Sequence, residues 1–234
     1  MKPIKILGIL AAASCGLAPF GQAQIILAEY NMDSLAASAS DVSVSAGDLT
    51  AADNLAVLST GNPGPDGGVY DDDILQAGVG TDHVYNTSAA AFENLAYFSY
   101  TLTVDSVDPV SFENISFQAT RGGDNPGRGF GLRVIDPLGT AIDIAEDVPL
   151  TTPRGTFSDF DYDLSSIASL QNVASGESIT FQMAVVMNSS FGSATRSIDV
   201  DNIQVTGIPE PSAYAALAGL LGLLIVARRR LRAA

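Results

Sequence analysis

The chain has no tryptophan, one histidine and one cysteine among its 234 residues. Since Cys15 is the only cysteine, no internal disulfide can form, and stability must come from packing, hydrogen bonds or a bound metal. His83 is the only histidine, and no Gly-x-Ser-x-Gly segment is present to hold a serine nucleophile. These absences count against nucleophilic catalysis, and the missing tryptophan counts against a sugar site built on indole stacking.

Positive charge is also scarce, with 11 lysines and arginines against 26 acidic residues and a net charge of −15. Six of the cations lie at the ends of the chain: Lys2, Lys5, Arg228, Arg229, Arg230 and Arg232. Setting these six and Glu210 aside leaves −20 between Gln24 and Pro209. A body this acidic repels phosphate backbones, which argues against nucleic acid as a partner. The acidity itself fits either a solvated surface or sites for divalent cations.

The first 23 residues have the three parts of a secretory signal peptide. Lys2 and Lys5 form a cationic start, residues 6–18 are mostly apolar, and Gly21 and Ala23 put small residues before a cleavage site. This pattern predicts a mature N-terminus at Gln24. A lipoprotein signal ending at Cys15 is the competing interpretation, but Ala12 stands where such signals usually carry leucine.

The other end of the chain changes composition abruptly over residues 208–234. Pro209-Glu210-Pro211 is followed by fifteen uncharged residues, Ala213–Ala227, and then by the arginine cluster at 228–232. The two prolines disfavour both helix and strand, so we expect Glu210 to be displayed on an accessible extended peptide. The apolar run spans about 22 Å as a helix, short of the ~30 Å bilayer core, but arginines can snorkel to the headgroups and stay in the cytoplasm. The sequence therefore predicts a single transmembrane helix at about 213–227.

In this order, Pro209-Glu210-Pro211, the apolar segment and the terminal arginines resemble the PEP-CTERM sorting signal of Gram-negative bacteria. The resemblance implies that an exosortase, a membrane-embedded processing enzyme, recognises the tripeptide and cleaves near it. It further implies export through the inner membrane, a C-terminal membrane anchor before processing, and delivery to the cell surface or an exopolysaccharide matrix. In this protein the tripeptide would be substrate and not catalyst.

The body between the two ends, residues 24–207, shows short runs of period-two alternation and no long helical pattern, which predicts an all-β domain. The clearest strands contain Phe98–Val104, Ile115–Ala119, Phe130–Val134 and Ile179–Val185. Further strands are expected at 25–30, 41–45 and 55–59, and long turns at 62–68 and 121–127. In the last strand the alternation slips across Asp201-Asn202, which indicates a β-bulge.

About eight to eleven short strands in ~180 residues favour an antiparallel jelly-roll-like β-sandwich, with a distorted barrel as the alternative. The final strand, Ser197–Gly207, running into the sorting tail, resembles the jelly-roll ectodomains of other PEP-CTERM proteins and, more loosely, carbohydrate-binding modules. Such modules often hold a structural Ca²⁺ between their first and last strands. The resemblance implies Glu29, Asp33 and Asp201 as its ligands here.

Other side chains suit binding chemistry without forming a diagnostic motif. Asp66, Asp71, Asp72 and Asp73 flank a glycine-rich turn, but their spacing matches no EF-hand loop, so a solvated acidic loop remains the alternative to a calcium site. His83 fits a metal ligand, a sugar-stacking residue or an ordinary polar side chain. Tyr70, Tyr85 and Tyr162 are the aromatic residues outside the clearest strands that could stack on a sugar.

The sequence thus predicts an exported, surface-sorted, non-enzymatic protein of the envelope or exopolysaccharide matrix, with a structural, adhesive or glycan-contacting role. The alternatives are a dedicated carbohydrate-binding module and a secreted polysaccharide hydrolase. A hydrolase needs two carboxyl groups ~5–9 Å apart, which counting acids neither finds nor excludes.

Overall fold

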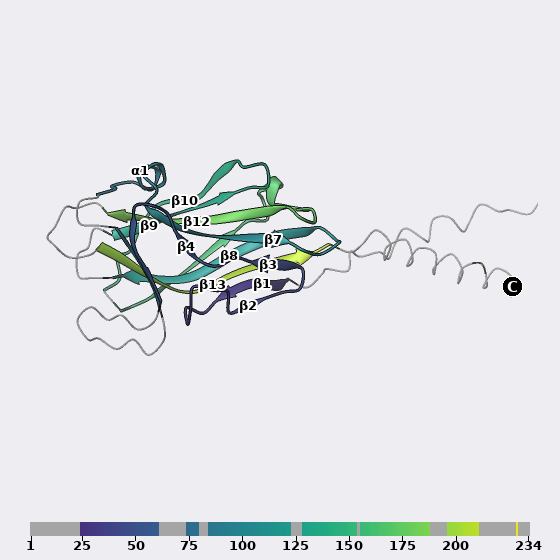
Figure 1. Ribbon diagram of the computed structural model, residues 1–234, viewed down its shortest axis with the longest axis horizontal. Helices are drawn as coiled ribbons and strands as arrows, with labels where there is room; N and C mark the ends of the chain where they lie inside the picture. Colours follow the sequence, from purple (N-terminus) through teal and green to yellow (C-terminus); the bar gives the residue numbers. More distant parts are fainter. Residues whose placement is uncertain are drawn as a thin grey trace, which may run out of the picture.

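The computed structural model describes residues 24–60, 74–79, 84–122, 128–153, 155–187, 196–210 and 228. The predicted signal peptide at 1–23 and the predicted transmembrane helix at 213–227 lie outside these residues. Within them, thirteen strands form two antiparallel sheets that face each other along the long axis of the molecule (Figure 1). The all-β antiparallel sandwich predicted from the sequence is confirmed.

The seven-stranded sheet is built around the longest strand of the body. Its main path, in spatial order, is β11 (Ser158–Asp163), β8 (Val110–Arg121), β13 (Arg196–Pro209), β1 (Ile25–Tyr30) and β2 (Ala39–Ser40). Two further strands extend it beside the first half of β13, namely β6 (Leu75–Val79) and β5 (Leu55–Ser59). Strand β13 therefore lies between β8 on one side and both β1 and β6 on the other.

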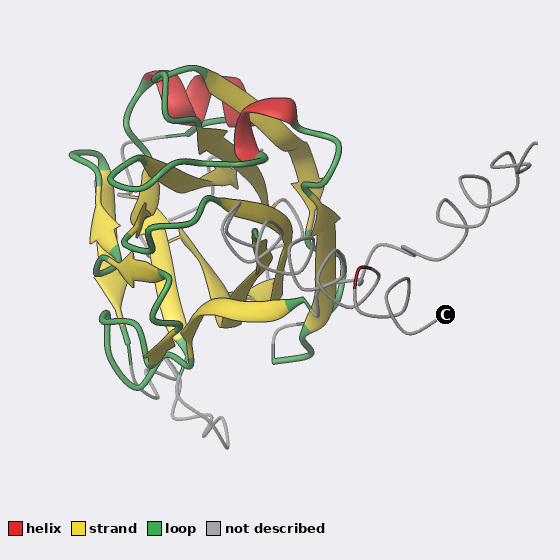
Figure 2. Cartoon of the chain, turned by 90° about the vertical axis from the view of Figure 1, so that its right-hand side faces the viewer, coloured by secondary structure: helices red, strands yellow, loops and turns green. Residues whose placement is uncertain are grey.

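The six-stranded sheet has the order β10 (Ala141–Pro149), β9 (Arg128–Ile135), β12 (Ser178–Met187), β7 (Tyr97–Val104) and β3 (Val44–Ala46), with β4 (Thr50–Ala51) also paired to β7. A short helix, α1 (Ser88–Glu93), packs on β12, β9 and β10 outside the strand layers (Figure 2). The helix can approach β9 this closely because residue 131 is glycine. A Cβ at that position would lie 2.2 Å from the Cβ of Ser88. One 3-10 turn, η1 (Ala168–Leu170), precedes β12.

The strand order identifies the sandwich as a jelly roll. Four strands in the order β1-β13-β8-β11 face four in the order β7-β12-β9-β10. From β7 onward the chain crosses between the sheets at every connection except the one joining β9 to β10. This is the two-Greek-key arrangement of a jelly roll, and the sequence alone does not reveal it.

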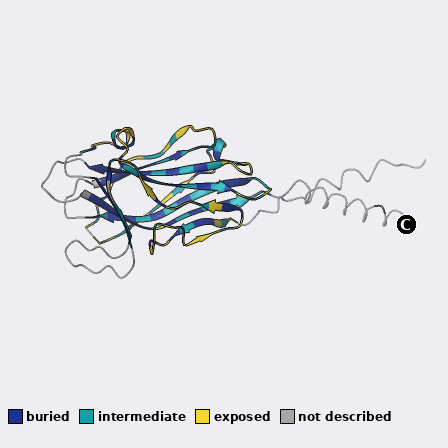
Figure 3. Ribbon diagram, in the orientation of Figure 1, coloured by how far each residue is buried: buried dark blue, intermediate teal, exposed yellow. Residues whose placement is uncertain are grey.

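The core lies between the two sheets because alternate residues of each strand point inward. In β7 the pattern alternates without a break, with Phe98, Tyr100, Leu102 and Val104 buried (Figure 3). An aromatic cluster joins the sheets at one end, where the Phe130 ring lies edge-on to Phe117 at 5.3 Å and to Phe160 at 4.9 Å. Inward packing of this kind fixes the outward register of the neighbouring residues.

The strands with the strongest apolar alternation lie where the sequence predicts them: β7, β8, β9 and β12, together with β1 and β5. The strand expected at 41–45 is displaced to 44–46. The bulge predicted at Asp201-Asn202 is confirmed, since the pairing of β13 with β8 shifts register between Asp201 and Gln204 and Asn202 has a φ of 50°. The long turns expected at 62–68 and 121–127 fall almost wholly outside the described residues.

Candidate functional site

Polar side chains point outward on four consecutive strands of the seven-stranded sheet, β11, β8, β13 and β1. On β11, Asp159 and Asp161 are exposed, whereas Phe160 and Tyr162, which alternate with them, turn toward the core. On β8, Ser116 and Gln118 point outward between buried Ile115, Phe117 and Ala119. We call the set Glu29, Ser116, Gln118, Asp159, Asp161, Asn202 and Gln204 the outer polar face.

Cross-strand pairing brings these side chains into a continuous ladder. Gln118 lies opposite Asp159, and its Nε2 donates to Asp159 Oδ1 at 2.8 Å. Ser116 lies opposite Asp161 on one side and Gln204 on the other. At the far end, Gln204 Nε2 donates to Glu29 Oε1 at 3.1 Å. These hydrogen bonds hold amide and carboxylate groups in fixed orientations at a surface open to solvent.

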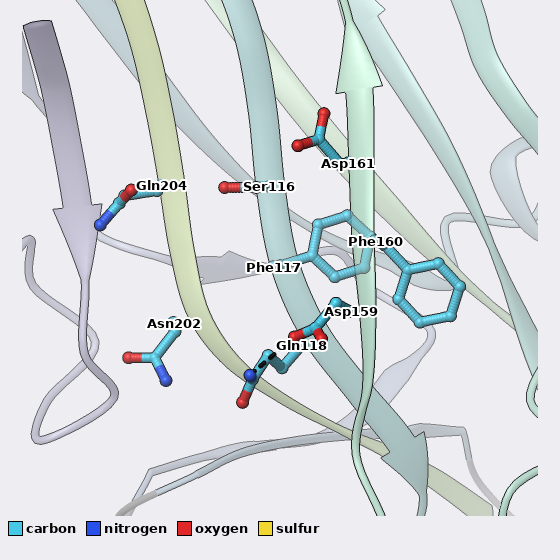
Figure 4. A pocket seen from close by; sticks show the side chains of 8 residues that line it. All are labelled: Ser116, Phe117, Gln118, Asp159, Phe160, Asp161, Asn202 and Gln204. Atoms are coloured by element: carbon cyan, nitrogen blue, oxygen red, sulfur yellow. Dashed lines mark hydrogen bonds between the residues drawn. The ribbon is translucent and has the colours of Figure 1, made fainter.

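A hollow of about 240 Å³ lies on this face, lined by Ser116, Phe117, Gln118, Asp159, Phe160, Asp161, Asn202 and Gln204 (Figure 4). The bulge in β13 contributes to its shape, because Asn202 is the extra residue and stands exposed beside Gln118 in the view. The lining offers carboxylate acceptors, amide donors and acceptors, and one hydroxyl. Such a set can form paired hydrogen bonds to neighbouring hydroxyl groups of a ligand.

The aromatic rings near the hollow do not form a stacking platform. Phe117 is 2% exposed, and its ring stacks on Phe160 at 5.4 Å within the core cluster. The sequence suggested Tyr85 and Tyr162 as sugar-stacking residues, and the structure corrects both. Tyr85 is 8% exposed, and Tyr162 packs inward, 6.1 Å from the Phe117 ring. Burial raises the pKa of both phenols. Tyr70 and His83 lie outside the described residues.

The three proposed calcium ligands are not gathered into one site. Glu29 accepts from Gln204 on the outer polar face, Asp33 accepts from Asn31 at 2.7 Å in the following loop, and Asp201 accepts from the backbone N–H of Asn202 at 2.7 Å. No group of three His, Cys, Asp or Glu side chains placed to hold a metal occurs among the described residues. Each of the three carboxylates has its own hydrogen-bond partner in the structure. The acidic loop at 66–73 lies outside the described residues.

Pro209 and Glu210, the first two residues of the predicted processing motif, are held against the sheet and not displayed on a free peptide. Pro209 is the last residue of β13 and pairs with Val110, so the strand runs two residues past the expected boundary at 207. Proline is tolerated there because it ends the strand. The Glu210 N–H donates to the Pro109 carbonyl at 2.8 Å, and the buried Ser111 hydroxyl donates to Glu210 Oε1 at 2.9 Å.

The remaining residues of the predicted processing and anchoring sites are mostly outside the described part of the chain. This holds for Ala23, Pro211, Arg229, Arg230 and Arg232. Arg228 is described and exposed. Gln24, the predicted first residue of the mature protein, is exposed beside β13, and its side-chain amide donates to Thr206 Oγ1 at 2.5 Å. Over the residues that the structure describes, no helix has both the length and the apolar character needed to cross a membrane.

The pKa values of Asp136 and Asp163 are both lowered. Backbone and side-chain donors, the Thr140 N–H foremost, lower the pKa of Asp136. Hydrogen bonds from Ser165, first from its side chain and then from its backbone, lower the pKa of Asp163. Glycoside hydrolysis uses a general acid whose pKa is raised, so neither group is suited to that role.

No family model matches the chain, and no curated protein matches it. Solved structures with a similar fold include a carbohydrate-binding module in complex with β-1,4-galactotriose, at 12% identity and a TM-score of 0.36, covering 72% of this chain and 90% of that chain. A xylan-binding domain from Paenibacillus barcinonensis matches at 12% identity and a TM-score of 0.39, covering 81% of this chain and 99% of that chain. A module from Caldicellulosiruptor saccharolyticus in complex with mannohexaose matches at 13% identity and a TM-score of 0.39, covering 78% of this chain and 96% of that chain. At these identities the likeness extends to the fold alone.

Proposed function

We propose that this protein is an exported, surface-sorted, non-enzymatic β-sandwich that binds extracellular polysaccharide through its outer polar face. The observation that carries the proposal is the hollow on the seven-stranded sheet, where Gln118, Asp159, Asp161 and Gln204 present hydrogen-bonding groups already oriented by their neighbours. Pre-oriented amides and carboxylates reduce the entropy lost on binding a polyhydroxylated chain.

The charge of the face favours a neutral glycan. Asp159 and Asp161 are exposed carboxylates on alternate positions of one strand, and the body around them carries −20. Uronate or sulfate groups would meet like charge at close range, which costs binding energy. Without an aromatic platform on this face, we expect modest affinity that depends mainly on hydrogen bonds.

Binding without catalysis is also the simplest use of these residues. The body contains no cysteine and a single histidine, and the lowered pKa values of Asp136 and Asp163 do not suit a general acid. The open sheet surface supplies contacts along a chain-like ligand. A non-catalytic, glycan-contacting role therefore fits better than hydrolysis.

Calorimetric titration with soluble neutral polysaccharides, chosen as galactans, xylans and mannans, tests the binding proposal. We expect Gln118→Ala and Gln204→Ala each to weaken binding by about tenfold, because each removes a hydrogen-bonding group and leaves its carboxylate partner reoriented. Gln182→Ala is the matched control, since Gln182 points outward from β12 on the opposite sheet. Absence of binding, or equal losses in all three variants, would refute the outer polar face as a glycan site.

The sorting half of the proposal rests on the order of features in the tail. The tripeptide Pro209-Glu210-Pro211 begins at the last residue of β13, and the uncharged run 213–227 and the arginines at 228–232 come after it. In this proposal an exosortase-type enzyme cleaves near the tripeptide after residues 1–23 have been removed during export. The anchored precursor then yields a protein of the cell surface or matrix.

Intact mass of the protein recovered from the surface of its native cells, beside that from cells lacking the processing enzyme, tests this half. Loss of the residues before Gln24 together with the residues after the tripeptide is the expected result. A C-terminal segment retained in both strains would make the protein permanently anchored and end the exosortase-substrate proposal.

A further inference from the structure

Three large apolar side chains stand almost fully exposed at one end of the sandwich. Val42 is 95% exposed, Val107 is 94% exposed and Leu138 is 85% exposed, the three highest values for such side chains among the described residues. Each lies in a connection between strands, at 41–43, 105–109 and 136–140. Isolated apolar side chains on a surface are ordinary, whereas exposed apolar side chains that gather in one region often mark a contact surface.

Hydrogen bonds and strand pairing place the three loops at the same end. The Ser43 carbonyl accepts from the N–H groups of Asp105 and Ser106, at 2.9 and 3.2 Å, which joins the first loop to the second. The third loop follows β9, whose last residue, Ile135, pairs with Thr180 near the start of β12. The start of β12 also pairs with the end of β7, where Ser178 lies opposite Thr103. All three loops therefore project beyond the same ends of β7, β9 and β12.

The tail leaves the body at this end. Pro209, at the end of β13, pairs with Val110, and the Glu210 N–H bonds to Pro109 in the second loop. We call the three loops together with Pro209 and Glu210 the exit end; it is the right-hand end of the ribbon in Figure 1. The uncharged run begins at Ala213, three residues after Glu210, and three residues reach about 10 Å at most. If that run is in a bilayer, the exit end cannot be far from the lipid.

We propose that the exit end faces the membrane in the anchored precursor, and that Val42, Val107 and Leu138 insert into the interfacial region of a zwitterionic lipid surface. This inference rests on the anchoring step of the proposed function. Apolar side chains at loop tips lose water contact on entering the acyl boundary, while the backbone of the loops stays in the headgroup layer.

The charges at the exit end decide the kind of lipid. Asp105 and Asp108 flank Val107, Asp41 precedes Val42, and Asp136 precedes Leu138 by two residues. The described arginines of the body lie elsewhere: Arg121 ends β8 and Arg128 and Arg196 begin β9 and β13, at the opposite end, and Arg133 lies within β9. Anionic headgroups would be repelled by these carboxylates, so a zwitterionic surface is the one that fits.

A site-specific fluorescent probe tests the proposal in the full chain. The single native cysteine allows Cys15→Ser to serve as the background for Val107→Cys and, as the matched control, Glu93→Cys, because Glu93 is exposed on α1 at the opposite end. Both are labelled with an environment-sensitive dye and reconstituted in phosphatidylcholine vesicles containing a spin-labelled lipid. We expect flotation of both proteins with the vesicles, but a blue shift and lipid quenching only for the probe at 107.

Each other outcome has a defined meaning. Flotation without quenching at 107 overturns the membrane-facing end and leaves the anchor intact. Failure to float overturns the anchor and this inference together. A blue shift without lipid quenching indicates that a second copy of the chain covers the tip, which also overturns the lipid assignment. Quenching that increases when anionic lipid replaces phosphatidylcholine would contradict the charge argument.

Discussion

Ser111 holds two groups at once. Its hydroxyl donates to Glu210 Oε1 and accepts from the backbone N–H of Asn172 at 3.1 Å, and the residue is 4% exposed. The hydroxyl of buried Ser111 therefore holds Glu210 against the first residues of β8. In the proposed processing step, an enzyme that binds Glu210 would compete with this contact, and the last residues of β13 would separate from β8 before cleavage.

Ser111→Ala should loosen that contact. We expect a loss of about 1 kcal/mol in the free energy of unfolding, because a buried hydrogen bond is removed and the Asn172 N–H loses its acceptor. Hydrogen exchange at the Glu210 amide should become faster in the full chain, and processing in cells should speed up with it. Ser178→Ala, which removes a hydroxyl pair with Thr103 in the other sheet, should leave Glu210 exchange unchanged. Identical exchange in the two variants would show that Ser111 does not hold the tail.

Asp136 gives the fold an acid-sensitive contact. Its pKa is lowered from the ordinary value of 3.8, so the carboxylate form is favoured in the folded protein. The resulting stability is present above that ordinary value and is lost as the pH falls through the lower folded value. Thermal unfolding at a series of acidic pH values should therefore show a steeper decline for the native chain than for Asp136→Asn. Parallel curves would mean that the Thr140 and Leu138 contacts are not electrostatic in origin.

At the scale of elements, β13 depends on a glycine near its end. A Cβ at Gly207 would lie 2.4 Å from the Ser111 carbonyl oxygen and 2.5 Å from Leu27 Cδ1. Gly207→Ala should therefore cost about 1–3 kcal/mol by forcing β13 away from β8. Gly47→Ala is the control, because its nearest contact would be 3.3 Å and a smaller shift relieves it. Denaturant titration measures both, and equal losses would argue against crowding at Gly207 as the cause.

The strands visible in the sequence are those with large apolar residues at every second position. In β7 and β12, Phe98 and Phe181 belong to unbroken runs of this kind, because both strands lie inside their sheet. Strand β10 was not predicted, since it is an edge strand with half-exposed residues and two register shifts. Strand β11 was missed although Ser158–Asp163 alternates aromatic and acidic residues, a signal that identifies both the strand and its outward carboxylates.

The outer polar face could not be assembled from the sequence for a different reason. Gln118, Asp159 and Gln204 become neighbours only through the order β11-β8-β13-β1, which joins residues far apart in the chain. Local periodicity carries no information on that order. The predicted bulge at Asp201-Asn202 was a local signal and was correct, whereas the implied calcium set needed three side-chain directions that no pattern specifies.

At the scale of the whole molecule, the acidic body should respond to salt. Acidic residues outnumber lysines and arginines by 26 to 11 over the chain, so the carboxylates in excess of the cations add mainly mutual repulsion. Raising sodium chloride from about 10 to about 150 mM shortens the Debye length from ~30 to ~8 Å, and a gain of about 1 kcal/mol would raise the Tm by about 2–4 °C. Repeating the series where the carboxylates are largely protonated should remove the effect. A Tm that falls with salt at neutral pH would indicate net attractive electrostatics instead.

Strand β13 also determines how the protein carries mechanical load. Its fourteen residues are bonded to β8 along one edge and to β6 and β1 along the other, and the tail continues from its last residue. Antiparallel ladder bonds lie perpendicular to the strands, so tension applied along the tail loads many of them in shear at once and does not peel them one by one. The same strand carries Asn202 and Gln204 on the outer polar face. Tension between a bound polymer and an anchored tail would thus pass between β13 and its neighbours through these bonds, a short path that stays within the seven-stranded sheet.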